Sequence, residues 1–188
     1  GGGEILVDEV RQRVARKKAQ TEEWLGVQEE AHRQGMKTSV TMMYGLGESD
    51  EDRIGHLFRV RELQARTGGF TAFICWPLQP EGTPGMSHYR KTDAVTYLRT
   101  LAIARIVLTN VPNLQSSWVT MGHKVGQVAL RFGANDYGSL MMEENVVSAA
   151  GTTYRTTLVE IERLIRDAGY QPVRRRQDYS LIEEPAAA

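Results

Sequence analysis

The chain has 188 residues, 23 basic and 23 acidic, and a hydrophobic fraction of 41%, which together are typical of a globular protein and exclude a disordered or fibrous chain. Without net charge the chain has no long-range field to attract nucleic acid, so nucleic acid is not an expected partner. No apolar run is long enough to span a membrane, so no membrane span is expected either. Cys75 is the single cysteine, which excludes an internal disulfide framework and indicates a reducing, cytoplasmic location.

Helix and strand signals alternate along the chain. Apolar residues recur at helical spacing in some segments, and continuous apolar runs mark others as strands. Ser49 with Asp52, and Thr157 with Glu160, are expected to begin two of the helices as capping pairs. The predicted elements are a helix around 5–14, a helix at 21–34 with Thr21 as N-cap, a strand at 38–44, a helix at 49–67, a strand at 70–76, a helix at 92–110, a strand at 114–119, a helix at 125–132, a short strand at 137–142 and a helix at 157–167.

This alternation predicts an α/β fold in which helices cover a parallel sheet, because parallel strands need crossover connections. Three or four such units make roughly half of an eight-stranded barrel, whose usual length is about 250 residues. In barrels of this kind the chemistry lies in the loops that follow the carboxyl ends of the strands. The loops after the predicted strands are therefore the candidate sites.

The loop after the first strand combines glycines with a carboxylate. Gly45 and Gly47 let a ligand approach the backbone, and Glu48 can accept hydrogen bonds from hydroxyl or amine donors. The alternative is that Glu48 only complements the dipole of the helix that follows. After the second strand, Trp76 and Gln79 offer an aromatic platform and an amide, which suit a flat substrate, although Trp76 is also explained by packing.

Later loops carry hydroxyls, carboxylates and amides. Ser117 and Trp118 close the third predicted strand, where a sugar or a carboxylate would find hydrogen-bond partners, although ordinary solvation of a strand end explains them equally well. Asn135, Asp136 and Glu143 belong to two acidic and amide-rich clusters. Such clusters bind polyhydroxylated ligands, act as bases or hold hard cations, and spacing alone does not choose among these roles.

No metal site is predicted within this chain. The histidines His32, His56, His88 and His123 have no spacing typical of metal ligands. Cys75 is interpreted as a buried small hydrophobe, because no nearby base signature supports a thiol nucleophile. The arginine run at 174–176 is interpreted as a solvated tail.

Several segments together resemble the C-terminal half of radical S-adenosylmethionine enzymes, and within that superfamily those of the futalosine route to menaquinone. The segments are GGGEIL at 1–6, TMMYG at 41–45, GGFTAFI at 68–74, SWVT at 117–120 and the stretch 126–150. The last of these favours a cyclase that acts on dehypoxanthine futalosine. The alternatives are an aminofutalosine synthase, a deazaflavin-forming FO synthase, and a half barrel without catalysis that binds a nucleoside-like ligand.

The resemblance implies that the complete enzyme, supplied with electrons by a reductant, cleaves S-adenosylmethionine at a [4Fe-4S] cluster and makes a 5′-deoxyadenosyl radical. That radical would take a hydrogen from the ribose of a nucleoside-like small-molecule substrate. The sugar radical would add to the attached ring, and loss of an electron and a proton would give the cyclic product. The cofactor supplies this chemistry, and the protein orients the substrate in a dry barrel.

Position within the matched segments assigns roles to individual residues. The resemblance assigns to S-adenosylmethionine Thr41, Met43, Gly45, Glu48, Phe73 and Ile74. It assigns to the substrate Trp76, Gln79, Ser117, Trp118 and Asn135, with Asp136 and Glu143 as catalytic candidates. Residues 1–170 would be the C-terminal part of a (β/α) barrel, and 171–188 a tail.

Some features depart from the family pattern. Leu-Gly-Glu at 46–48 stands where the family usually has His, Val or Ile, and Glu, and Cys-Trp at 75–76 replaces Pro-Trp. The Cys-x3-Cys-x2-Cys motif that holds the cluster is expected upstream of Gly1, because one cysteine does not supply three thiolate ligands. The chain alone is therefore expected to be a fragment that holds no cluster and has no activity.

Overall fold

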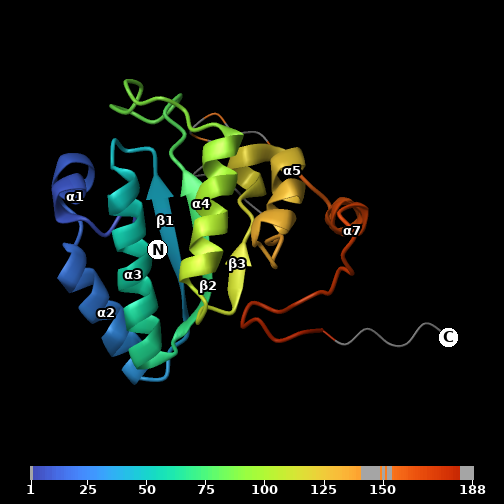
Figure 1. The fold of residues 1–188 in the computed structure, drawn as a ribbon, viewed down its shortest axis with the longest axis horizontal. Coiled ribbons are helices and arrows are strands. Elements are labelled where there is room, and N and C mark those ends of the chain that lie inside the picture. The colour runs from blue at the N-terminus through green and yellow to red at the C-terminus, as the bar shows by residue number, and fades with distance from the viewer. Residues whose placement is uncertain (1, 141–148, 150, 152–153, 183–188) are drawn as a thin grey trace.

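The fold is a parallel sheet with helices against it, as the alternating pattern predicts (Figure 1). A computed structural model describes residues 2–140, 149, 151 and 154–182. The strands β1 (Thr38–Tyr44), β2 (Phe70–Pro77) and β3 (Asn113–Gln115) pair in the order β1-β2-β3, and both pairings are parallel. The α/β class is confirmed, and the three strands form a sheet of the kind expected for half a barrel.

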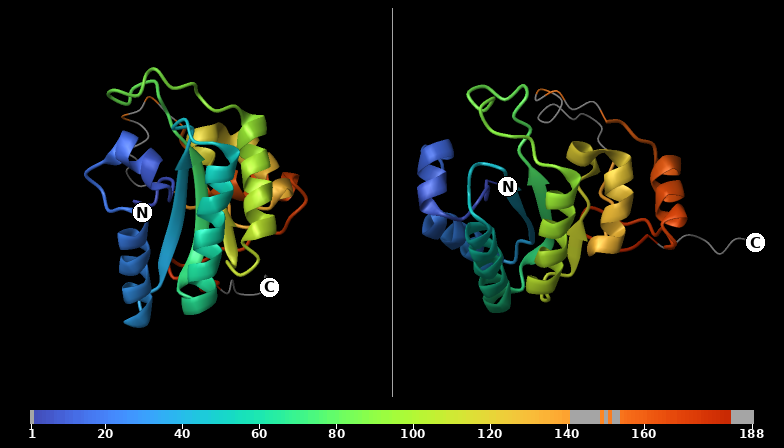
Figure 2. Two further views of the ribbon diagram at one scale, coloured as in Figure 1. Left: turned by 60° about the vertical axis from the view of Figure 1, so that its left-hand side comes forward. Right: turned by 45° about the horizontal axis from the view of Figure 1, so that its top comes forward.

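Helices supply the crossovers and flank the sheet. In Figure 1, α3 and α4 lie across one face of the sheet, α1 and α2 lie beyond β1, and α5 and α7 lie beyond β3; both views of Figure 2 agree. The helices are α1 (Asp8–Ala15), α2 (Thr21–Arg33), α3 (Asp50–Thr67), α4 (Ala94–Val107), α5 (Trp118–Ala129), the short 3₁₀ helix η1 (Leu130–Phe132) and α7 (Leu158–Asp167).

The core lies between the sheet and its helices. Along β1, Val40, Met42 and Tyr44 are fully buried, while the residues between them are only half-buried. Burial of one such side chain stabilises a fold by about 1.5–3 kcal/mol. Since side chains alternate along a strand, the sheet has one fully packed face and one open face. None of the helices described is long and apolar enough to cross a membrane.

Local capping agrees with the sequence at two helices and differs at a third. Ser49 and Asp52 form the expected capping box of α3, and the Thr157 side chain accepts from the Glu160 amide at the start of α7. The N-cap of α2 is Gln20, so the prediction of Thr21 is wrong. Thr21 is instead the first helical residue, because its amide donates to Asp8 Oδ1 at 2.7 Å.

The third strand is shorter than the predicted 114–119. Its ladder stops where the Ser116 amide donates to the Asp136 carbonyl, at 2.8 Å, instead of to β2. Ser117 and Trp118 are therefore not strand residues: Ser117 is the N-cap of α5, and Trp118 is its first residue. The helix predicted at 125–132 likewise begins earlier, with a kink at Gly122, and ends as η1.

The strand predicted at 137–142 is absent from 137–140. Asp136 makes only an isolated parallel bridge to Gln115, and Gly138, with a φ of 102°, turns the chain away. Residues 141 and 142 lie outside the described residues. At the other end of the chain, Ile5 and Leu6 precede α1 instead of forming part of it, and the Met43 amide donates to the Glu4 carbonyl at 3.1 Å.

Candidate functional site

Two rows of side chains cross the open face of the sheet. Thr41 of β1 pairs with Ile74 of β2, which in turn pairs with Gln115 of β3. One step nearer the carboxyl ends, Met43 pairs with Trp76. Paired residues of parallel strands point to the same face, and all five are half-buried. The fold therefore brings expected cofactor residues and the expected substrate residue Trp76 together.

Phe73 faces the opposite way from Ile74. Its side chain is fully buried in the packed face, with its ring centroid 6.3 Å from that of His56 on α3. Only the backbone of Phe73 therefore remains near the open face. Cys75 also lies in the packed face, and burial raises the pKa of its thiol to about 12, which agrees with the interpretation as a small hydrophobe.

The loop after β1 is held by Glu48. Its carboxylate accepts from the amides of Gly45, at 2.9 Å, and Leu46, at 2.6 Å. The third donor is Arg53 Nε, at 2.8 Å, and the Glu48 side chain is completely buried. Gly45 has a φ of 89°, and a Cβ there would approach Thr92 Oγ1 to 2.9 Å. Glu48 thus fixes the shape of a tight loop through bonds that neither sequence interpretation anticipated.

The loop after β2 is also internally bonded. Gln79 is buried, and its side-chain amide donates to the Pro77 carbonyl at 3.1 Å. The Gln79 carbonyl accepts from the Thr83 hydroxyl at 2.6 Å. These bonds fold the loop back on the end of β2. The side-chain amide of Gln79, three residues after Trp76, is therefore turned to the backbone.

Ser117 and Trp118, predicted to close the third strand, lie beyond its end at the start of α5. The Ser117 amide donates to the Tyr97 hydroxyl at 2.8 Å. The Trp118 ring is buried and stacks on His123, with 5.2 Å between centroids. Trp118 Nε1 is buried and has no hydrogen-bond partner among the described residues. An unmade hydrogen bond of this kind costs free energy.

Asn135 and Asp136 lie on the segment beside β3, where Asp136 makes an isolated parallel bridge to Gln115 of the first row. Asn135 Oδ1 accepts from the Leu114 amide, and its Nδ2 donates to the Pro112 carbonyl, which places the Asn135 amide beside the start of β3. The Asp136 carboxylate accepts from Arg175 of the tail at 2.7 Å. The interpretation of the arginine run as solvated is therefore wrong for Arg175. Glu143 lies outside the described residues.

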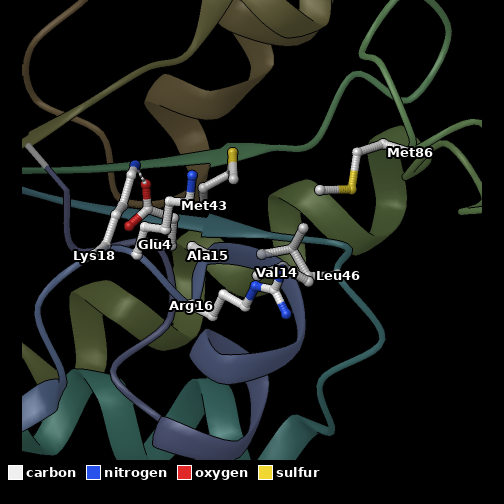
Figure 3. A pocket seen from close by; sticks show the side chains of 9 residues that line it. Glu4, Val14, Ala15, Arg16, Lys18, Met43, Leu46 and Met86 are labelled. Atoms are coloured by element: carbon white, nitrogen blue, oxygen red, sulfur yellow. Dashed lines mark hydrogen bonds and ion pairs between the residues drawn. The ribbon is translucent and has the colours of Figure 1, made fainter.

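A cavity of about 410 Å³ lies at the carboxyl edge beside β1 (Figure 3). Met43 is the one expected site residue in its wall. Its lining joins β1 and the loop after it to the segment before α1, the end of α1, and the loop after β2. The lining residues are Glu4, Val14, Ala15, Arg16, Lys17, Lys18, Met43, Leu46 and Met86.

Glu4 is a site residue that the sequence analysis missed. Its carboxylate forms an ion pair with Lys18, drawn in Figure 3, and lies 3.8 Å from Arg11. Glu4 Oε2 is buried and has no hydrogen-bond partner among the residues described. Glu4 also has a φ of 31°, which is uncommon outside glycine. Gly3, directly before it, was the available signal, because the missing Cβ lets this segment approach the Thr41 carbonyl of β1.

A second cavity, of about 560 Å³, lies between α7, the segment 134–140 that follows η1, and the tail. Its lining is largely apolar and includes Asp136 and Arg175. None of the expected cofactor residues lies in its wall. In the described part of the chain, no three His, Cys, Asp or Glu side chains come together as a metal site.

The comparisons with known proteins identify the family. Residues 67–188 match the family described as the CofH/MqnC C-terminal region. The chain is 50% identical over 182 residues to cyclic dehypoxanthine futalosine synthase of Halalkalibacterium halodurans, covering 97% of this chain and 49% of that protein. It is 45% identical to the Streptomyces coelicolor protein of the same name, covering 98% and 47%.

More distant relatives carry other names. The chain is 39% identical over 180 residues to aminodeoxyfutalosine synthase of Thermus thermophilus, covering 93% of this chain and 48% of that protein. The chain thus spans about half the length of the curated relatives it matches. With a family match over more than half of its residues, the chain belongs to the CofH/MqnC family, and residues 67–188 correspond to the family's C-terminal region.

Proposed function

We propose that this chain is the C-terminal half of a cyclic dehypoxanthine futalosine synthase, a radical S-adenosylmethionine cyclase of menaquinone biosynthesis. The observation that carries the proposal is the identity of 50% and 45% to two proteins of that name, against 39% to an aminodeoxyfutalosine synthase. In this proposal the substrate is dehypoxanthine futalosine. The enzyme would receive its electrons from a reductant and would work in the cytoplasm.

S-Adenosylmethionine suits the open face and the first cavity. Ile74 and Met43 provide apolar surface for a base, and the loop at Gly45 brings backbone close. Glu4 Oε2 is a buried acceptor, 3.8 Å from Arg11, that has no hydrogen-bond partner among the described residues. Such a mix of apolar walls and a few fixed polar groups is typical of cofactor sites. When bound, this cofactor supplies the chemistry that removes a hydrogen atom from the substrate.

The iron–sulfur cluster does not fit this chain. Its ligands are cysteine thiolates, and Cys75 is the single cysteine. Cys75 is fully buried in the packed face, and its raised pKa keeps the thiol protonated. We propose that the cluster ligands lie outside these 188 residues, and that the chain alone is inactive.

The chain's own residues would orient the substrate and exclude water. Trp76, beside Met43, would stack on the planar part of the substrate, and Trp118 Nε1 would donate to one of its oxygens. Thr41 and the backbone of Phe73 would contact the cofactor, and Glu48 would act through the loop it holds. Gln79, Ser117 and Asn135 would line the substrate side, and Asp136 and Glu143 remain the proposed proton acceptors.

The test uses the complete protein, purified anaerobically with its cluster and given S-adenosylmethionine, a reductant and dehypoxanthine futalosine. The expected result is a cyclic product whose mass is that of the substrate less two hydrogens. One of these hydrogens should pass from the ribose to 5′-deoxyadenosine. Turnover only in an assay for the aminodeoxyfutalosine synthase reaction, or only in one for deazaflavin formation, would reassign the enzyme within the family. Absence of any turnover by a cluster-loaded protein would contradict the proposal.

A further inference from the structure

Arg11 on α1 is a cation buried as deeply as the apolar core, with an exposed fraction of 1%. Its guanidinium donates to four main-chain carbonyls: Gly3 at 2.7 Å, Gly2 and Ile5 at 3.3 Å, and Ala19, to which Nε donates at 2.9 Å. A buried charge is costly unless it is fully bonded, and here the bonds satisfy it. Arg11 therefore ties together the segment before α1, α1 itself and the loop after it.

These connected pieces form one side of the first cavity. The segment before α1 contributes Glu4, and the loop that ends at Ala19 contributes Lys18 (Figure 3). The segment lies close against β1, because a Cβ on Gly3 would come within 2.7 Å of the Thr41 carbonyl. The Met43 amide completes the join by donating to the Glu4 carbonyl.

The charge arrangement also centres on Glu4. Its carboxylate lies 3.8 Å from Arg11 and is ion-paired with Lys18, so it is the nearest anion to the buried guanidinium. The planar fork of arginine reaches several carbonyls at once in fixed directions. A lysine ammonium keeps the charge but cannot bridge four carbonyls from two separate segments.

We propose that Arg11 is a positioning residue of the S-adenosylmethionine site, which it builds by holding the Glu4 carboxylate against the cavity beside Met43. The proposal rests on the proposed function. Arg11 lies outside the cavity lining and touches no ligand in this account. It acts through the main chain of 2–5 and through Ala19, and its loss would move Glu4 relative to β1.

The first test is Arg11→Lys in the complete, cluster-loaded protein, with Arg33→Lys as the matched control. Arg33 is an exposed arginine paired with Glu30 on α2, far from the cavity lining. Arg11→Lys is expected to weaken equilibrium binding of S-adenosylmethionine about tenfold or more, in keeping with the loss of hydrogen bonds to a charged group. Arg33→Lys should bind within about twofold of the wild type, the ordinary range for a surface change.

A second variant moves the same segment without touching Arg11. Gly3→Ala places a methyl group against the Thr41 carbonyl and should push Glu4 away from β1, with a loss of affinity similar to that of Arg11→Lys. Arg11→Lys and Gly3→Ala both act on the segment that carries Glu4. The fold-loss of S-adenosylmethionine affinity in the double variant should therefore be smaller than the product of the two single fold-losses. Wild-type affinity in folded Arg11→Lys, or in Gly3→Ala, would overturn the proposal.

Amide hydrogen exchange at Met43 separates this proposal from the proposed function. Exchange there should be faster in Arg11→Lys than in the wild type and unchanged in Arg33→Lys, because the Met43 amide bonds to Glu4. If the wild-type protein showed no S-adenosylmethionine chemistry, the proposed function would be wrong. The exchange measurement would still report whether Arg11 places the segment that carries Glu4. Unchanged protection at Met43 in Arg11→Lys would show that Arg11 does not place the segment.

Discussion

Asp136 and Arg175, 39 residues apart in the chain, form an ion pair of 2.7 Å that joins the tail to the segment beside β3. Both side chains are mostly buried, and the Arg175 guanidinium also lies 4.0 Å from the centre of the Tyr179 ring. An antiparallel backbone bridge between Arg175 and Leu181 also folds the tail on itself. The ion pair therefore anchors the tail at Arg175, while residues 176–178, 180 and 181 are exposed.

Arg175→Gln is expected to release the tail, because it leaves the Asp136 carboxylate without its cation. Limited proteolysis should then cut within 171–182 several times faster than in the wild type. Arg176→Gln is the control, since Arg176 is exposed and its side chain bonds only to Ser180 and Leu181 of the tail itself among the described residues. Equal cleavage of both variants would show that the ion pair does not hold the tail.

Glu48→Gln is expected to loosen the loop after β1. The substitution removes the negative charge of the carboxylate to which the Gly45 amide and Arg53 donate. Hydrogen bonds to a charged group contribute about 1.5–3 kcal/mol each to stability. Denaturant unfolding of the complete protein should show a loss of about 2 kcal/mol, accompanied by weaker binding of S-adenosylmethionine. Glu51→Gln, an exposed change on α3, is the control. Unchanged stability and unchanged affinity for S-adenosylmethionine would favour the alternative that Glu48 only complements the dipole of α3.

Cys75 is expected to resist alkylation in the folded protein. Burial raises the pKa of its thiol to about 12, so the reactive thiolate is scarce at pH 8. Mass spectrometry after iodoacetamide treatment should show no label on Cys75 under native conditions, and full labelling in denaturant. Rapid native labelling would contradict its burial in the packed face.

The 188-residue chain by itself is expected to bind far less than one iron–sulfur cluster after anaerobic reconstitution. One buried cysteine does not replace three thiolate ligands. Iron and sulfide analysis with electron paramagnetic resonance is the measurement. Stoichiometric cluster binding together with S-adenosylmethionine cleavage would refute the assignment of the cluster ligands to residues outside this chain.

Buried His56 is expected to lower the free energy of unfolding in acid. Burial lowers its pKa from 6.5 to about 3, and its Nδ1 accepts from the Leu6 amide, which requires the neutral ring. A depressed pKa means that the stabilisation is complete above pH 6.5 and decreases as the pH falls toward 3, by at most about 1.4 kcal/mol per unit. Chemical unfolding from pH 7 to 4 should show this slope, and His56→Gln should reduce it. The same slope in both proteins would contradict this account.

Local signals in the sequence determined most of the elements and part of the site. The extended segment predicted at 38–44 matches β1 residue for residue, and Ser49 with Asp52 caps α3, because strand patterns and helix capping depend on neighbours in the chain. Parallel pairing then follows from the crossovers. The register that sets Met43 beside Trp76 was not predicted and is a finding of the structure. The family motifs lie on these same strands, so their expected residues meet on one face.

Only the tertiary structure decided which polar groups at the ends of helices and strands bond to one another. No sequence pattern showed that Arg11 bonds to the segment carrying Glu4, that Glu48 turns back on its own loop, or that Arg175 pairs with Asp136. The third strand stops early for the same reason, because the Ser116 amide finds Asp136 instead of β2. Such bonds depend on where separate segments come to lie, and a buried polar group takes whichever partner the packed chain brings within reach.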